Sequence, residues 1–190
     1  MLRRTWNICN ITFGFFWADG CINRYKTFTV RLQEKDKEVL DFFYSYFGGI
    51  RKTRNFKRKD GRKYIQEEWQ INDVVFVNNL KENMFRDNID CVPKKHFNHF
   101  LRGLIDGDGC FRVSNGKLNQ ISISSNFDDD FAWLKDRLNI PFRITQVDGA
   151  SKYSAIYLKG GNEALNQFVE WLYKGATIWL KRKRISQRTK

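Results

Sequence analysis

Two short stretches of the chain repeat each other and limit what it can fold into. Residues 11–20 and residues 100–109 are both apolar runs that contain a glycine and end in an Asp-Gly pair. Aligning Asp19 with Asp108 gives an offset of 108 − 19 = 89 residues. Recurrence at a fixed offset indicates a duplicated structural unit.

The polarity pattern after each stretch alternates between strand and helix periods. Alternation every second residue predicts strands, and apolar residues three and four positions apart predict helices. The predicted hairpins are 21–33, 50–72, 110–125 and 142–159. Besides the first stretch, the predicted helices are 36–47, 73–84, 96–107, 128–138 and 161–173. The order αββαββα therefore occurs twice, which predicts an α+β fold of two pseudo-symmetric repeats.

The boundaries between these repeats follow from the loss of periodicity around Pro93. We expect a first repeat at 1–86, a linker at 87–95, a second repeat at 96–174 and a basic C-terminal tail at 175–190.

The charge balance predicts a polyanionic partner. The chain has 34 Lys and Arg against 21 Asp and Glu, a net charge of +13. Its 16% aromatic content is typical of a packed protein rather than of a disordered basic tail. Such a partner is either nucleic acid or an anionic membrane surface, and nucleic acid is expected rather than a membrane. No stretch is long and apolar enough to span a bilayer.

The four cysteines form no CxxC pair, so reduced thiols in an intracellular protein are expected. The host compartment would be a bacterial or phage-infected cytoplasm, an archaeal cell or an organelle. His96 and His99 have no third ligand near them in sequence, so a metal site there is not expected.

Small residues recur four positions apart in both repeated stretches, at Gly14 and Ala18 and at Gly103 and Gly107. On a helix such residues share one face and permit a close approach of two backbones. If the two helices pack together, the aspartates that follow come side by side at the helices' C-terminal ends.

Two adjacent carboxylates repel each other unless a proton or a cation lies between them. A helix C-terminus adds negative partial charge, which favours a hard divalent ion such as Mg²⁺. Such an ion beside a phosphodiester could activate water and stabilise the departing oxygen. Asp108 aligns with Asp19, whereas Asp106 aligns with Trp17, so Asp108 is the predicted ligand and Asp106 a structural residue.

The stretch from Leu101 to Gly109 resembles the motif of the LAGLIDADG homing endonucleases, with substitutions at Arg102 and Gly107. The first copy keeps four residues of the motif: Gly14, Ala18, Asp19 and Gly20. The repeated αββαββα order is similar to that of the monomeric, two-repeat members.

This resemblance implies a fold and an activity. The motif helices would form the interface between the repeats, and two curved antiparallel β-sheets would form a DNA-binding saddle. Both strands of double-stranded DNA would be cut at a specific site to leave short 3′ overhangs, as in intron homing.

The resemblance also implies an active site that needs Mg²⁺, with Mn²⁺ or Ca²⁺ able to replace it in binding. The implied metal ligands are the carboxylates of Asp19 and Asp108 and the backbone carbonyls of Ala18, Gly20, Gly107 and Gly109. Gln33 and Lys159 match the glutamine and lysine that surround the metal-bound water. The counterpart of Gln33 in the second repeat would be Ser124 or Ser125, and that of Lys159 in the first would be Asn72.

The exposed faces of the two sheets are expected to carry the DNA-binding residues. Strands can enter the major groove, where Arg and Lys read guanine and Asn and Gln read adenine. The predicted residues are Arg24, Lys26, Arg31, Arg51, Arg54, Lys57, Arg112, Lys117, Asn119, Gln120, Arg143 and Gln146.

The sequence thus predicts a monomeric, site-specific, double-strand DNA endonuclease. The alternative is a non-cleaving nucleic-acid binder on the same scaffold, either a maturase that holds intron RNA or a DNA-binding regulator. The presence of both Asp19 and Asp108 favours the nuclease, because a pure binder has no need of two abutting carboxylates.

Overall fold

The computed structural model describes residues 12–23, 26–57, 60–83, 90, 92–125, 131–134, 136–148 and 152–183. The chain forms two compact units, one of Asp19–Cys91 and one that joins Met1–Ala18 to Val92–Lys190. The N-terminal helix, residues 12–19, therefore lies mostly with the second unit, although it opens the first repeat in sequence.

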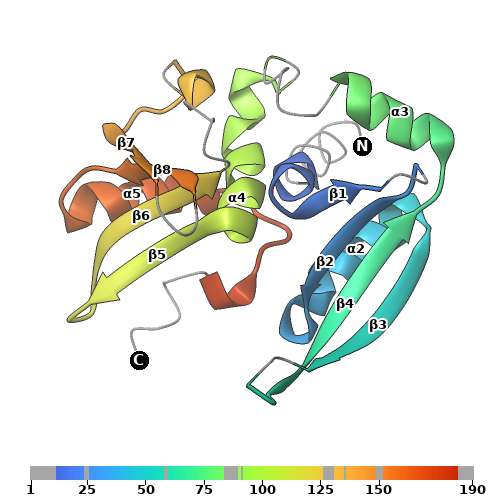
Figure 1. The fold of residues 1–190 in the computed structure, drawn as a ribbon. Helices are drawn as coiled ribbons and strands as arrows, with labels where there is room; N and C mark the ends of the chain where they lie inside the picture. Colours follow the sequence, from blue (N-terminus) through green and yellow to red (C-terminus); the bar gives the residue numbers. More distant parts are fainter. Residues whose placement is uncertain are drawn as a thin grey trace. The chain divides into compact units, whose positions relative to one another are not determined.

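The unit Asp19–Cys91 is built on an antiparallel four-stranded sheet in the order β1-β2-β4-β3. Its elements are β1 (Gly20–Ile22), β2 (Phe28–Gln33), α2 (Lys37–Phe47), β3 (Ile50–Lys57), β4 (Lys63–Ile71) and α3 (Val74–Asn83). Helix α2 packs against one face of the sheet (Figure 1). The alternate side chains Phe28, Val30 and Leu32 are buried, as predicted.

The second unit contains a matching antiparallel sheet in the order β5-β6-β8-β7. Its elements are α4 (Phe97–Asp108), β5 (Gly109–Ser114), β6 (Lys117–Ser125), β7 (Phe142–Val147), β8 (Tyr153–Leu158) and α5 (Asn162–Tyr173). The turn between β5 and β6 is at Asn115 and Gly116, whose φ angles of 52° and 70° suit a tight hairpin. The α+β fold with two antiparallel sheets is therefore confirmed.

The helix predicted at 128–138 is wrong over the residues that the structure describes there. Phe131 has a φ of 53°, which a right-handed helix cannot accommodate, and only residues 132–134 form a short 3₁₀ turn. Phe131 and Leu134 are nevertheless fully buried. Their apolar spacing marks core contacts of an irregular segment, which sequence periodicity alone cannot distinguish from a helix. Residues 126–130 and 135 lie outside the described part of the chain.

The N-terminal helix touches α4 backbone to backbone. A Cβ atom added to Gly14 would lie 2.6 Å from the Leu104 nitrogen and 2.9 Å from the Gly103 Cα, and still closer to the Phe100 carbonyl oxygen. Real Cβ atoms do not approach backbone so closely, so only glycine fits at position 14. The predicted close approach through Gly14 and Gly103 is thereby confirmed.

The C-terminal end of α4 is tied to the segment that follows α5. Asp106 is fully buried and accepts hydrogen bonds from the Tyr173 hydroxyl at 2.8 Å and from the Leu180 N–H at 2.9 Å. Burial raises the pKa of Asp106 to about 6, which still leaves it ionised at neutral pH. Buried Arg102 lies close enough to be its counter-charge and donates to the Leu172 carbonyl at 3.1 Å.

Part of the predicted basic tail is therefore packed against the motif helix rather than extended in solvent. Leu180 is buried, and Lys181–Lys183 form a 3₁₀ turn. Residues 184–190 lie outside the described part of the chain. Among the residues described, no helix is long and apolar enough to cross a membrane.

Gly14→Ala is expected to lower the free energy of unfolding by about 2 kcal/mol or more, because the added methyl group meets backbone atoms that cannot move aside. The effect should exceed the roughly 1 kcal/mol that alanine gains over glycine in a helix. Chemical denaturation measures the change. Gly161→Ser is the control, since nothing lies within 4 Å of a Cβ there and φ is −69°. Equal stability of the two variants would contradict the close contact.

Asp106→Asn is expected to lower the free energy of unfolding by about 3 kcal/mol, because it leaves buried Arg102 without its counter-charge. Asp108→Asn, two residues later on an exposed side chain, should change it by no more than about 0.5 kcal/mol. Denaturation of both variants under one set of conditions makes the comparison. A larger loss for Asp108→Asn would reverse the roles assigned to the two aspartates.

Candidate functional site

Each repeated helix ends on its aspartate. Asp19 is the last residue of helix 12–19, and Asp108 is the last residue of α4. The chain then turns directly into a strand, β1 at Gly20 and β5 at Gly109. A Cβ at Gly109 would lie 2.5 Å from the Ile105 carbonyl oxygen, so glycine lets the strand fold back over the last helical turn. Asp108 is left exposed at the helix end, while Asp19 is half-buried.

The carbonyl oxygens at the end of α4 converge on one ammonium group. Lys183 Nζ donates to the carbonyls of Ile105 at 3.0 Å, Gly107 at 2.9 Å and Gly109 at 2.7 Å. The Ile105 and Gly107 carbonyls belong to the last turn of α4 and Gly109 begins β5, so a cation there complements the helix dipole. The end of α4 is therefore built to receive positive charge.

This arrangement changes the expected set of metal ligands. The donors at the end of α4 are hard oxygens suited to Mg²⁺, and the ammonium of Lys183 already stands in for a cation there. The carbonyls of Gly107 and Gly109, expected as ligands, accept hydrogen bonds from Lys183 instead. The carboxylate of Asp108 is the donor best suited to a divalent ion. Within the described residues, no three His, Cys, Asp or Glu side chains gather to form a metal cage.

The strand registers show which positions of the two repeats correspond. Val30 pairs with Gly20, and Ile123 pairs with Gly109, so Val30 and Ile123 are equivalent. Gln33 lies three residues after Val30, so its equivalent lies three residues after Ile123, at position 126. This position is outside the described residues, and the expected counterparts Ser124 and Ser125 do not correspond to Gln33.

The position of Lys159 agrees with its expected counterpart. Phe28 pairs with Ile71 on β4, and the equivalent Ile121 pairs with Leu158 on β8. The next residues, Asn72 and Lys159, therefore correspond. Gln33 and Lys159 are both exposed, at the ends of β2 and β8.

The predicted DNA-binding residues of the first sheet divide between its two faces. Arg31 and Arg54 lie on the face opposite α2, which we call the open face of the sheet. Arg51 lies on the α2 face, where it pairs with Asp41 of α2 and with Glu67 at 3.1 Å. Lys57, six residues further along the same strand, shares the face of Arg51. The expectation that Arg51 and Lys57 lie on the open face is therefore wrong, because strand alternation sets them opposite Arg54. Lys26 is exposed in the β1–β2 turn, and Arg24 lies outside the described residues.

The second sheet also has an open face, opposite the one that carries Ile121 and Ile123. This face carries Arg112 paired with Gln120, and Lys117 paired with Ser114. Arg143 joins them with its guanidinium over the Tyr157 ring, 5.1 Å from the centroid. Two predicted residues differ in position: Gln146 pairs with Ser154 on the other face, and Asn119 occupies a β-bulge. The bulge follows Leu118, whose N–H is held at 2.9 Å by Asn162 Oδ1.

Sequence reasoning missed two charged residues of functional interest, Lys183 and Glu68. Lys183 lies 74 to 78 residues from the carbonyls it contacts, so no local pattern identifies it. Glu68 is fully buried between Arg31 and Arg54. The pair Glu67-Glu68 inside an otherwise basic hairpin was a visible signal of buried ion pairing.

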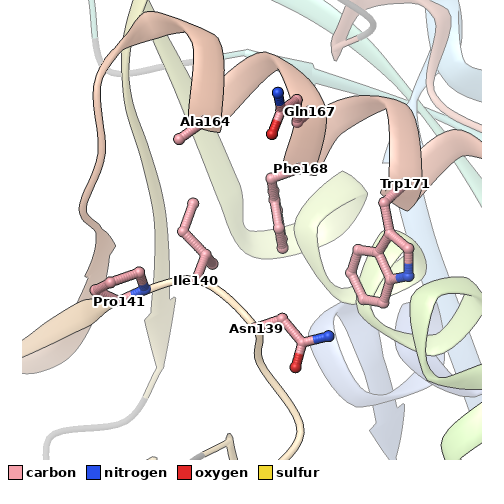
Figure 2. Close-up of a pocket in the computed structure, with 7 residues that line it drawn as sticks. All are labelled: Asn139, Ile140, Pro141, Ala164, Gln167, Phe168 and Trp171. Atoms are coloured by element: carbon pink, nitrogen blue, oxygen red, sulfur yellow. The ribbon is translucent and has the colours of Figure 1, made fainter.

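A separate pocket lies beside α5, with a volume of about 270 Å³ (Figure 2). Its lining residues come from α5 and from the segment before β7: Asn139, Ile140, Pro141, Ala164, Gln167, Phe168 and Trp171. None of these side chains is acidic, basic or nucleophilic. The pocket therefore offers no groups for hydrolysis, and the candidate site remains the acidic ends of the two repeated helices.

Comparison with known proteins agrees with this geometry. Residues 98–172 match the model of a LAGLIDADG-like domain. That region runs from α4 to α5 and contains the whole second sheet. No curated protein sequence resembles the chain closely enough to count as a relative.

Solved structures of homing endonucleases share the architecture of the chain at low sequence identity. I-WcaI bound to its DNA recognition sequence is 14% identical with a TM-score of 0.65, over 94% of this chain and 86% of that one. Mesophilic variants of I-DmoI are 13% identical with a TM-score of 0.55, over 89% of this chain and 96% of that one. The I-SmaMI LAGLIDADG homing endonuclease bound to cleaved DNA is 11% identical with a TM-score of 0.55, over 93% of this chain and 85% of that one. Residues 98–172 thus resemble a LAGLIDADG-like domain, and the chain as a whole shares the fold of these homing endonucleases.

Proposed function

We propose that the protein is a site-specific DNA endonuclease that cuts both strands of a long double-stranded target by metal-assisted hydrolysis. The observation that carries this proposal is the paired helix ends, where Asp19 and Asp108 each close a glycine-packed helix. As a homing endonuclease it would act as a monomer inside the cell and leave short 3′ overhangs.

The two aspartates would hold a hard divalent cation, with Mg²⁺ the best match to their oxygen donors. Such an ion, when bound, stabilises negative charge on the scissile phosphate. Asp19 and Asp108 follow their helix-packing glycines, Gly14 and Gly103, by the same five residues. The contact between Gly14 and Gly103 supports the idea that both carboxylates serve one site.

Gln33 and Lys159 are proposed to act on the attacking water and on the phosphate. An amide such as that of Gln33 can orient a water by accepting a hydrogen bond from it and donating one to its oxygen. The ammonium of Lys159 would offset the charge that develops on the phosphate oxygens. Only the second repeat has this lysine, since Asn72 takes its place in the first, so the two strands would be cut by unequal sets of side chains.

The open faces of the two sheets are proposed to contact the DNA. Arg31, Arg54, Arg112 and Arg143 can reach base edges in the major groove, where arginine pairs with guanine. The other basic residues would contact phosphates, which take the larger share of bonds in such interfaces.

One observation favours the alternative of a non-cleaving nucleic-acid binder, such as an intron RNA maturase or a DNA-binding regulator. Lys183 already neutralises the end of α4, so this helix end is stable without a divalent ion. A binder would keep that arrangement and need no metal. The test below therefore scores binding and cutting separately.

The proposal is tested by incubating the protein with Mg²⁺ and a randomised or genomic duplex library, and by sequencing the cut ends. Cutting by the unaltered protein should fall at least about a thousandfold in Asp19→Asn and in Asp108→Asn, since metal stabilisation is worth several kcal/mol. Both variants should still retain duplexes in Ca²⁺. Binding without cutting by the unaltered protein would establish the alternative, and cutting that survives either substitution would remove that aspartate from the site.

Lys183→Met is expected to lower the free energy of unfolding by about 2 kcal/mol, because it removes charged hydrogen bonds to three partly buried carbonyls. It should also lower the Mg²⁺ concentration that half-saturates cutting, because a positive charge beside Asp108 is lost. Lys181→Met, with the same change of charge two residues away on an exposed side chain, is the control. An unchanged Mg²⁺ requirement for cutting in Lys183→Met relative to Lys181→Met would mean that the ammonium does not influence the metal site.

A further inference from the structure

Glu68 lies beneath two arginines on the open face of the first sheet. Arg31 Nε donates to Glu68 Oε2 at 2.5 Å, and Arg54 Nη2 donates to Glu68 Oε1 at 2.9 Å. The Glu68 side chain is 0% exposed, whereas the side chains of Arg31 and Arg54 are 46% and 45% exposed. The carboxylate is thus covered by the groups that it holds.

Three neighbouring strands contribute to this cluster. Glu68 lies on β4, Arg31 lies directly opposite it on β2, and Arg54 lies on β3 opposite Gln66, one diagonal step away. The antiparallel register therefore fixes all three Cα positions. Each arginine reaches inward to the central strand, and both guanidinium groups are held over the middle of the sheet.

The charge state of Glu68 supports this arrangement. Burial raises the pKa of Glu68, but the hydrogen bonds and positive charges of Arg31 and Arg54 outweigh that effect and hold the pKa below its ordinary value. The group is therefore an anion at neutral pH. With no exposed surface, it cannot itself contact a base.

Both arginines keep donors for another partner. A guanidinium has five N–H donors in a fixed fork, and within the described part of the chain Arg31 bonds only Glu68, through its Nε–H, which leaves both terminal nitrogens for a further partner. Arg54 uses one terminal nitrogen. A guanidinium held in one orientation loses less conformational entropy when it binds a guanine edge through two hydrogen bonds.

We propose that Glu68 is a positioning residue that orients Arg31 and Arg54 to read guanine in the major groove. The proposal rests on the proposed function, since it requires that the open face of the first sheet contacts DNA. It assigns part of the sequence specificity to an acidic residue that never touches the nucleic acid.

The neighbouring Glu67 provides a matched control. Glu67 also holds an arginine, Arg51 at 3.1 Å, and it accepts a hydrogen bond from the Thr53 hydroxyl at 2.9 Å. Strand alternation places it on the α2 face, away from the proposed DNA contact. Glu67→Gln and Glu68→Gln therefore make the same chemical change one residue apart on opposite faces.

The test selects duplexes from a library with a randomised segment, bound in Ca²⁺ by the unaltered protein, Glu68→Gln and Glu67→Gln, and compares the base preferences by sequencing. Glu68→Gln should lose discrimination by about fivefold or more at a few neighbouring guanine positions and keep the remaining preferences. Glu67→Gln should keep the whole profile. An unchanged profile for Glu68→Gln, or equal losses in both variants, overturns the proposal.

Arg31→Lys and Arg54→Lys keep the test decisive if Glu68→Gln does not fold. Each substitution retains the positive charge beside Glu68 but removes the guanidinium that can donate two hydrogen bonds to one guanine. Each variant should therefore lose guanine preference at some of the positions affected in Glu68→Gln. Loss at non-guanine positions, or no loss, overturns the proposal. If the unaltered protein selects no sequence at all, the proposed function fails before the role of Glu68 is reached, so the two failures are distinguishable.

Discussion

The direct contact between the backbone of the N-terminal helix and that of α4 is the constraint on which the rest of the structure depends. At Gly14 there is room for a hydrogen atom and for nothing larger. This approach buries Phe15, Phe16 and Phe100 completely or nearly so, with the Trp17 ring edge-on to Phe100 at 5.4 Å. Each of the two helices in this contact ends on an aspartate, Asp19 or Asp108.

The acidic ends of these helices require compensation, because carboxylates and helix carbonyls have charges of the same sign. The chain supplies it from a distant segment. Tyr173, Leu180 and Lys183 hold Asp106 and the last carbonyls of α4, so the exposed Asp108 projects from a turn that is already neutralised. In the other unit, Glu68 performs the reverse task, holding two cations on a basic surface.

Local patterns predicted the regular elements well, because strand alternation and helix spacing are imposed by burial on one face. Phe28, Val30 and Leu32 alternate and lie in the core. Alignment of the two repeats alone assigned Asp108 as the metal ligand and Asp106 as a structural residue, and in the structure Asp106 is buried. The failures involve information that is not local. The positive φ of Phe131 ends a pattern that looks helical, and the contacts of Lys183 and Glu68 join residues that are distant in sequence.

The grouping of the N-terminal helix with the second unit has a consequence for how the chain is made. Residues 12–18 are synthesised before their partner α4, which follows only after the whole of Asp19–Cys91. The intervening unit can form its sheet during that interval, because domains generally fold as they emerge. Until α4 has been synthesised, the apolar helix with Phe15 and Phe16 cannot pack against it. Its docking closes a long loop late, which is the step most exposed to wrong partners.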